Sequence, residues 1–210
     1  RVLLDMAVSL DGLICGPGGD DGGLYDWYFN PTQISRPVVD ELVSTTGAII
    51  IGRGAFGTGD VAGGWEDTPY RVPHFVVTHR PPWPAPGGTI EFVFVPAGVR
   101  AAVQLAREAA GERYATIGGG ADLARQCLAE RLVDEVQLHV VPVVLGDGTP
   151  LFDRSGVGWH LTKTRVVDAT QPGGFDFLGY HFEQGKRWPR KKSLRKLKDT
   201  VRRHTRRTRG

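Results

Sequence analysis

Cysteine and long apolar runs are scarce in this sequence, and each absence removes a class of protein. Only two cysteines occur, Cys15 and Cys127, which is too few for a disulfide framework and matches no metal-site spacing. No apolar run reaches the length of a membrane-spanning helix. Charge and glycine interrupt the first stretch, RVLLDMAVSLDGLICG, so it lacks the pattern of a secretory signal. We therefore expect a cytoplasmic protein with reduced thiols and no membrane contact.

Basic residues are concentrated at one end of the chain. Residues 186–210 contain 13 of the 26 Lys and Arg residues but one of the 23 acidic residues, so they carry about +12 and the rest about −9. Leu194, Leu197 and Val201 fall at helical spacing, so this tail is expected to be helical or disordered. Its charge predicts non-specific RNA or DNA binding that weakens with salt. A vestigial extension is the alternative.

The first 158 residues alternate between strand-like and helix-like patterns. Strands are predicted over 1–8, 47–52, 73–80, 90–96, 113–117 and 134–146, and helices over 36–46, 98–111 and 121–132. The apolar stretch GAIIIG is typical of a strand buried on both faces. Pro142 favours a bend or an edge position for the last strand. The alternation predicts an α/β domain over 1–158, with a mostly parallel sheet flanked by helices.

A run of glycines separates the strand that ends at Ile117 from the helix that begins near Ala121. The N-terminus of a helix presents unpaired backbone N–H groups, and glycine lets an anion approach them closely. Gly118, Gly119 and Gly120 therefore fit a phosphate-binding turn. Their spacing is not that of the G-x-G-x-x-G fingerprint, and a plain tight turn is the alternative.

Two other strand ends carry residues suited to phosphate. Gly52 and Arg53 follow one apolar strand, and Thr78 and Arg80 end another. Ligands of open α/β sheets bind beyond the carboxyl ends of the strands, so these residues are expected to converge with the glycine run. Arginine makes two-pronged phosphate contacts, and the set predicts a dinucleotide with an extra phosphate. Solvated surface arginines are the alternative.

Four stretches occur in the order and spacing of one known family. They are MAVSLDGLI, GAIIIGRGAFG, PHFVVTHRP and IGGGADLARQCLAERLVDEVQLHVVPVVLGDGTPLF. On these residues, the segment 1–155 resembles the dihydrofolate-reductase-like family that includes the reductase domain of riboflavin-biosynthesis deaminase-reductases. The resemblance implies a dihydrofolate-reductase-like fold, a homodimer, and an NADPH-dependent reductase that transfers a hydride to a small heterocyclic substrate. It places the cofactor at Gly52, Arg53, Thr78, Arg80, Gly118, Gly119, Gly120 and Ala121.

The resemblance also nominates residues for the substrate side. Asp11 in the turn SLDG is the expected proton donor, because an aromatic pocket would raise its pKa; a cap of its own turn is the alternative. Trp27 and Phe29 in GGLYDWYFN are expected to stack on a flat heterocycle, and a hydrophobic lid is the alternative. The histidines form no metal-ligand pattern, and His139 is expected to be a strand residue rather than a base.

One position departs from the riboflavin reductases. There the residue before the glycines is typically a glutamate that faces the substrate, whereas Ile117 stands here. An apolar side chain cannot accept hydrogen bonds from a ribityl or pyrimidine group. The sequence therefore favours a less characterised reductase of the same family over one that acts on the riboflavin intermediate.

The last 50 residues resemble a different family. GFDFLGYHF followed by RWPRKKSLRKLKD, within residues 160–210, resembles the reverse transcriptase/maturase of bacterial group II introns. The YADD-type catalytic aspartates are absent from the sequence, so the tail is not expected to polymerise nucleic acid. A hairpin over 159–185 is expected to complete the sheet of the body, with the basic tail beyond it. The alternative function is a nucleic-acid-binding protein with an inactive reductase-like scaffold.

Overall fold

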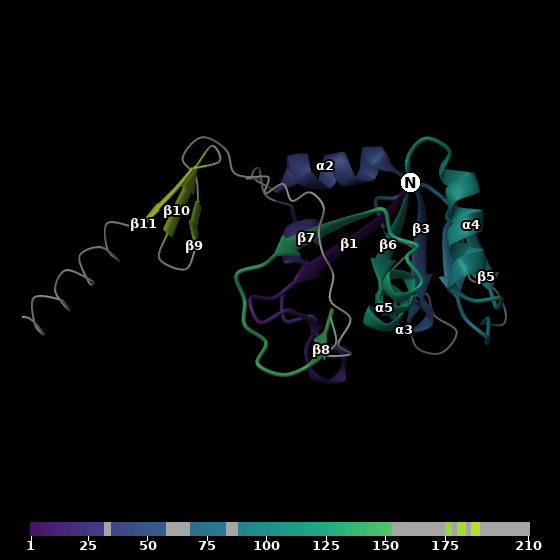
Figure 1. Cartoon of the computed structure of the whole chain (residues 1–210), viewed down its shortest axis with the longest axis horizontal. Helices are drawn as coiled ribbons and strands as arrows, with labels where there is room; N and C mark the ends of the chain where they lie inside the picture. The colour runs from purple at the N-terminus through teal and green to yellow at the C-terminus, as the bar shows by residue number, and fades with distance from the viewer. Residues whose placement is uncertain are drawn as a thin grey trace, which may run out of the picture. The chain divides into compact units, whose positions relative to one another are not determined.

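The chain divides into an N-terminal unit and a C-terminal unit, and a parallel sheet forms the centre of the N-terminal unit (Figure 1). The computed structural model describes residues 1–31, 35–57, 68–82 and 88–152, and three short strands between 175 and 189. Six strands pair in the order β5-β4-β3-β6-β1-β7, and every pairing is parallel. Their bounds are β1 (Val2–Val8), β3 (Thr46–Gly52), β4 (His74–Val77), β5 (Phe92–Val95), β6 (Tyr114–Gly119) and β7 (Glu135–Val140). The α/β sheet predicted from the sequence is confirmed.

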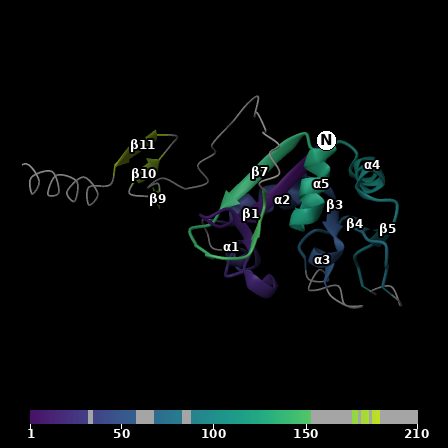
Figure 2. The same ribbon diagram turned by 60° about the horizontal axis from the view of Figure 1, so that its bottom comes forward.

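Helices cover both faces of this sheet. The three longer ones are α2 (Arg36–Thr45), α4 (Val99–Ala110) and α5 (Ala121–Ala129), close to the predicted ranges, and α1 (Asp26–Phe29) and α3 (Arg53–Phe56) are single turns. α4 and α5 lie side by side and bury their apolar stripes against one face (Figure 2). α2 and α3 pack on the opposite face. No helix among the described residues is long and apolar enough to cross a lipid bilayer.

Successive side chains along each strand point to opposite faces of the sheet, so their order determines which residues lie on which face. On β1, Leu4 and Met6 join the core cluster under α4 and α5. Asp5 and Ala7 therefore point to the α2 and α3 face. On β3, Ile50 belongs to the first cluster and Ile49 to the second. This alternation places a carboxylate on an otherwise apolar strand, on the face away from the larger core.

The edge strand β7 and a small ribbon complete the body. β7 ends two residues before Pro142, in agreement with the bend or edge position that the proline predicts. β2 (Leu13–Cys15) and β8 (Thr149–Pro150) pair as a separate two-stranded ribbon. Leu151 follows this ribbon and is fully buried in the core cluster, which anchors the chain after the long loop from β7.

Three short strands in the C-terminal unit pair with one another. They are β9 (Phe175–Phe177), β10 (Tyr180–Glu183) and β11 (Lys186–Pro189), and both pairings are antiparallel. Within the hairpin expected over 159–185, the described residues form β9 and β10. The first part of that hairpin and the expected helix of the tail lie outside the described residues. That residues 159–185 complete the main sheet stays a prediction.

Candidate cofactor and substrate site

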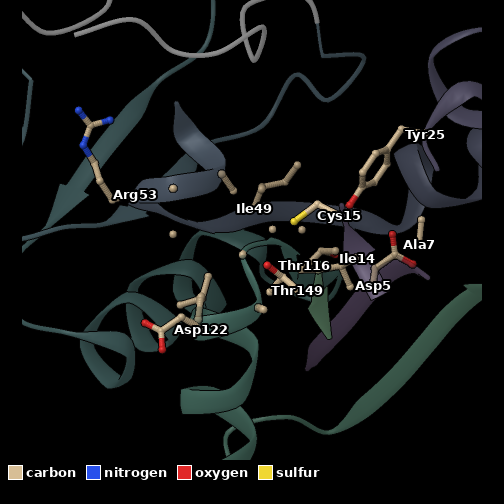
Figure 3. A pocket seen from close by; sticks show the side chains of 18 of the residues that line it. Asp5, Ala7, Ile14, Cys15, Tyr25, Ile49, Arg53, Thr116, Asp122 and Thr149 are labelled. Atoms are coloured by element: carbon tan, nitrogen blue, oxygen red, sulfur yellow. The ribbon is translucent and has the colours of Figure 1, made fainter. Parts of the chain in front are cut away.

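A cavity of about 950 Å³ lies beside the strand ends of the body. One end is formed by the glycines at the ends of β3 and β6, and the other by aromatic and acidic side chains. Figure 3 shows this division: Arg53 and Asp122 lie at one end, and Tyr25 and Asp5 at the other. Of the residues predicted to form a site, the cavity is lined by Gly52, Arg53, Gly118, Gly119, Gly120, Ala121, Trp27 and Phe29.

At the glycine end, two backbone turns approach each other. Ile51 of β3 lies opposite Gly119 of β6, and a register shift just before them leaves Gly118 as an extra residue in β6. Such bulges redirect a strand next to functional sites. Gly120 has a φ of +91°, and an ideal Cβ on it would lie 3.9 Å from the Cα of Gly52. The positive φ is what favours glycine at this position, since 3.9 Å is an ordinary van der Waals distance.

The N-terminus of α5 faces the same end of the cavity. Gly120 caps the helix without a side-chain hydrogen bond, and the first helical bond runs from the N–H of Ala124 to the carbonyl of Gly120. The N–H groups of the three preceding residues make no such bond, as at every helix start. Asp122 lies in this first turn, and its carboxylate accepts a 2.8 Å hydrogen bond from Gln126.

After β4, the residue that lines the cavity is not one of the two that the sequence predicted. Thr78 is buried, and its hydroxyl accepts a 3.1 Å hydrogen bond from the backbone N–H of Arg80, which closes the turn after β4. The Arg80 side chain is exposed, and neither residue lines the cavity. His79, between them, does line it. Arg53 lies against the ring of Phe56 and donates a 2.6 Å hydrogen bond to the carbonyl of Gly57.

Asp11 does not line the cavity. Its side chain is instead hydrogen-bonded to the loop that follows β7. Its carboxylate accepts hydrogen bonds from the Ser9 hydroxyl at 2.6 Å and from the N–H groups of Gly146 at 2.8 Å and Leu145 at 3.2 Å. These hydrogen bonds, with that of Ser9 the largest contribution, lower the pKa of Asp11. The rise in pKa expected from the sequence is therefore wrong. The contacts fit the capping alternative, and a proton-donating role for Asp11 stays a prediction.

Replacing Asp11 by asparagine should destabilise the fold at neutral pH, because the neutral amide accepts hydrogen bonds more weakly than a carboxylate. A lowered pKa stabilises the native state above the ordinary value of 3.8, and this contribution is lost as the pH falls through the lower native value. The difference in Tm between wild type and D11N should therefore shrink between pH 6 and pH 3, as followed by circular dichroism. A difference that stays constant over this range would contradict the assignment.

Aromatic side chains form the opposite end of the cavity. Trp27 and Phe29 line it, together with Tyr25 and Tyr28, and Phe29 is 62% exposed. Burial raises the pKa of Tyr25 to about 12, with smaller contributions from Cys15, Asp5 and Asp21. The indole Nε1 of Trp27 is buried and has no hydrogen-bond partner among the described residues. This end therefore combines flat apolar surfaces with an unsatisfied donor.

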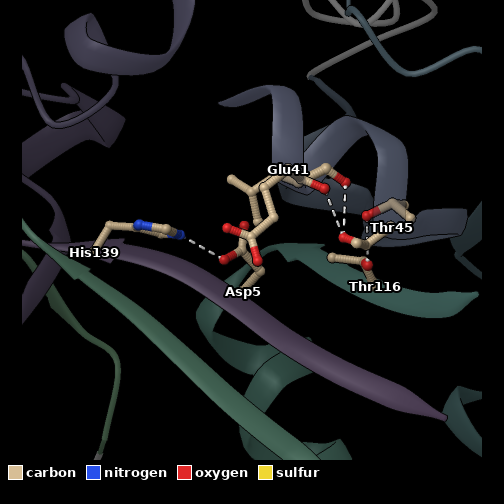
Figure 4. Close-up of polar contacts among 7 residues, drawn as sticks. Asp5, Glu41, Thr45, Thr116 and His139 are labelled. Atoms are coloured by element: carbon tan, nitrogen blue, oxygen red, sulfur yellow. Dashed lines mark hydrogen bonds and ion pairs between the residues drawn. The ribbon is translucent and has the colours of Figure 1, made fainter. Parts of the chain in front are cut away.

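A carboxylate–imidazole pair lies at this aromatic end. Asp5 on β1 and His139 on β7 both line the cavity, and Oδ1 of Asp5 lies 2.7 Å from Nε2 of His139 (Figure 4). His139 is a strand residue, as expected, but its side chain contributes to the site, which the sequence interpretation missed. The available signal was the acid inside the apolar stretch RVLLDMAV, since buried acids are rarely left without a partner.

Ile117 does not face the cavity. Its side chain is fully buried in the core cluster under α4 and α5, while its neighbours Thr116 and Gly118 line the cavity. Alternation along β6 produces this arrangement. The expectation that Ile117 occupies a substrate-facing position is therefore wrong, and its apolar side chain does not argue against the riboflavin intermediate.

A parallel α/β sheet with glycine-bearing strand ends at a cavity defines a class of ligand-binding proteins in which the ligand lies beyond the strand ends. Within that class, the chain belongs to the RibD C-terminal domain family, whose model matches residues 1–171. The dihydrofolate-reductase-like α/β fold predicted from the sequence is thereby confirmed. The match includes residues 160–171, the start of the segment that resembles a maturase, and the comparisons give that second resemblance no support.

Individual proteins are also similar to this chain. The chain is 27% identical over 178 residues to the uncharacterized protein YwjB of Bacillus subtilis, covering 82% of this chain and 92% of that protein. A putative riboflavin biosynthesis protein from Shewanella sp. PV-4 is 24% identical with a TM-score of 0.54, covering 80% of this chain and 93% of that one. The Thermotoga maritima diaminohydroxyphosphoribosylaminopyrimidine deaminase/5-amino-6-(5-phosphoribosylamino)uracil reductase is 18% identical with a TM-score of 0.52, covering 89% and 54%. These two structures establish similarity of fold alone.

Proposed function

We propose that this chain is an NADPH-dependent reductase that transfers a hydride to a small heterocyclic substrate. The observation that carries the proposal is the two-ended cavity: bare glycine backbone and an arginine at one end, aromatic rings at the other. Such a division suits a dinucleotide whose phosphates and reactive ring need different surroundings. Membership of the RibD C-terminal domain family supports the same function.

The glycine end fits the diphosphate of the cofactor. An ideal Cβ on Gly52 would lie 3.5 Å from the Cβ of Leu123 and 3.8 Å from the carbonyl oxygen of Gly119, so any longer side chain would fill the cradle. Backbone N–H groups at the start of α5 suit an anion. Arg53 adds a positive charge to this end of the cavity, whose lining also includes Asp122. Thr78 would hold the turn that presents His79, and Arg80 would add positive charge at the rim.

When bound, NADPH supplies the hydride, and the chain binds, orients and shields the reacting groups. Trp27 and Phe29 would stack on the substrate ring and exclude water. The reduction of a C=N or C=O bond also requires a proton. Cys15 and Cys127 are free thiols, in keeping with a reducing compartment such as the cytoplasm. The homodimer implied by the family resemblance stays a prediction.

A titration of the full chain with NADPH, followed by nucleotide fluorescence, tests this function. We expect a dissociation constant in the micromolar range, about −8 kcal/mol, and binding of NADH at least about tenfold weaker, because NADH lacks the extra phosphate. Absence of binding by both nucleotides at millimolar concentration would contradict the proposal. Salt-sensitive RNA retention in that case would favour the second candidate, nucleic-acid binding by the tail over 186–210, which its charge of about +12 supports.

A further inference from the structure

Asp5 and His139 are fixed by the sheet rather than by a loop. β1 and β7 run parallel, with Ala7 opposite His139, so Asp5 and His139 are diagonal neighbours on one face. Each of the two side chains is only 14% exposed. Figure 4 shows the imidazole and the carboxylate approaching each other across the two strands. A partly buried carboxylate–imidazole pair that lines a cavity is a candidate functional group.

The hydrogen bond determines which ring nitrogen can exchange a proton with a ligand. An ionised carboxylate only accepts hydrogen bonds, so Nε2 of His139 carries the proton that faces Asp5. Nδ1 is then the ring nitrogen that does not face Asp5. The ring of Trp27 lies 4.6 Å from the imidazole and is inclined to it by 35°, which restricts the orientation of the imidazole plane. Asp5 and Trp27 thus both restrict the orientation of the His139 ring.

Three phenols near the pair, those of Tyr25, Tyr28 and Tyr70, hold their protons tightly at neutral pH. Burial raises the pKa of all three tyrosines, to about 12 for Tyr25 and Tyr28. These phenols therefore stay protonated. Asp11, the donor expected from the sequence, lies outside the cavity lining.

The charge at this end of the cavity favours a cationic ligand. Asp5 and Asp21 are acids, and the only arginines among the described lining residues, Arg53 and Arg125, come from α3 and α5. The guanidinium of Arg125 donates hydrogen bonds to the carbonyls of Pro150 and Leu151. A cation over the indole of Trp27 would gain further from the ring quadrupole. The two acids therefore favour an iminium ion at this end of the cavity.

We propose that His139 donates the proton in the reduction inferred above, that Asp5 positions its ring, and that the reduced bond is the C=N bond of a flat ring. The inference rests on the proposed function. The substrate nitrogen takes the proton from the His139 imidazolium, and the neighbouring carbon takes the hydride. The substrate gains two electrons, NADPH becomes NADP⁺, and the imidazole recovers its proton from water. His139 is the catalytic residue, and Asp5 is a positioning residue.

Dihydroisoquinoline, a flat bicyclic imine, serves as the probe with the full chain and NADPH. We expect wild type to reduce it, and His139→Gln to lower kcat about 100-fold while KM changes less than about threefold. Asp5→Asn should lower kcat about tenfold, because the ring loses its fixed orientation. Glu135→Gln is the matched control on the same strand, since Glu135 bonds to Arg1 and does not line the cavity. It should keep wild-type kcat.

Three kinetic outcomes would overturn the proposal: wild-type kcat in His139→Gln, a change in KM alone, or no reduction of the imine by a wild-type chain that binds NADPH. NADPH titrations separate this from a failure of the proposed function. His139→Gln should bind NADPH within about twofold of wild type. A wild-type chain that does not bind NADPH would overturn both proposals.

A readout without turnover tests the same assignment. Nitrogen NMR of the imidazole rings should show His139 protonated at Nε2 in wild type, and a mixture of tautomers in Asp5→Asn. Tetrahydroisoquinoline, the amine product of the probe, should shift the His139 signals. It should leave those of the fully buried His74 unchanged. If the amine left the His139 chemical shifts unchanged, the proposal would be overturned.

Discussion

Replacing Gly52 by aspartate is expected to weaken NADPH binding at least about 100-fold, or about 2.7 kcal/mol. The new carboxylate would lie in the cradle between Leu123 and Gly119, where the diphosphate is proposed to bind. Two unit charges about 5 Å apart near a protein surface repel by about 3 kcal/mol. Fluorescence titration of the purified variant measures the loss directly.

Gly52→Asn separates charge from size. Asparagine has nearly the shape of aspartate but no charge, so it should weaken NADPH binding by about tenfold or less. The difference between the two variants should also decrease as salt is added, because the repulsion is partly screened. Equal affinities of the aspartate and asparagine variants would show that no phosphate lies near Gly52, and the cofactor assignment of the glycine end would be wrong.

Replacing Gly47 by alanine should cost about 3 kcal/mol of folding stability. An ideal Cβ on Gly47 would lie 2.7 Å from the carbonyl oxygen and 2.8 Å from the Cα of Ala110, and 2.9 Å from the Cβ of Arg113. Two of these atoms are backbone at the end of α4, which cannot move without disturbing the helix. For a chain of this size the loss corresponds to a decrease in Tm of roughly 6 to 12 °C.

Gly54→Ala is the control for this prediction. An ideal Cβ on Gly54 meets no atom within 4 Å, and its φ lies outside the left-handed region. Alanine there should leave Tm within about 2 °C of wild type or raise it slightly. Thermal denaturation of the two variants by circular dichroism compares them directly. Equal Tm values would mean that α4 does not pack against β3 as described.

The sequence predicted the elements well because their signals are local. The apolar stripe of α4 predicts a helix, and the unbroken apolar run of β3 predicts a buried strand. Neither prediction needs information from the rest of the chain. The meeting of Gly52 with the glycines after β6 could also be predicted, because parallel strands end at one edge of a sheet. This inference needs only the direction of the strands and not their register.

The sequence predictions were wrong where strand register determines which side chains face the cavity. Ile117 and Gly118 are adjacent, but only alternation along β6 and the bulge determine which one faces the cavity. The same holds for His79 between Thr78 and Arg80. The Asp5–His139 pair is 134 residues apart in sequence, and its existence depends on β1 and β7 being neighbours. No local pattern contains that information.

The position of β1 between β6 and β7 has a consequence for any chemistry in the cavity. The bulge at Gly118 and the imidazole of His139 stand on strands two spacings apart, which is roughly 10 Å in a hydrogen-bonded sheet. A change in the loops leaves this separation unaltered, because the backbone ladder sets it. The proposed hydride donor at the glycine end and the proposed proton donor His139 would therefore be held at a spacing that the sheet determines.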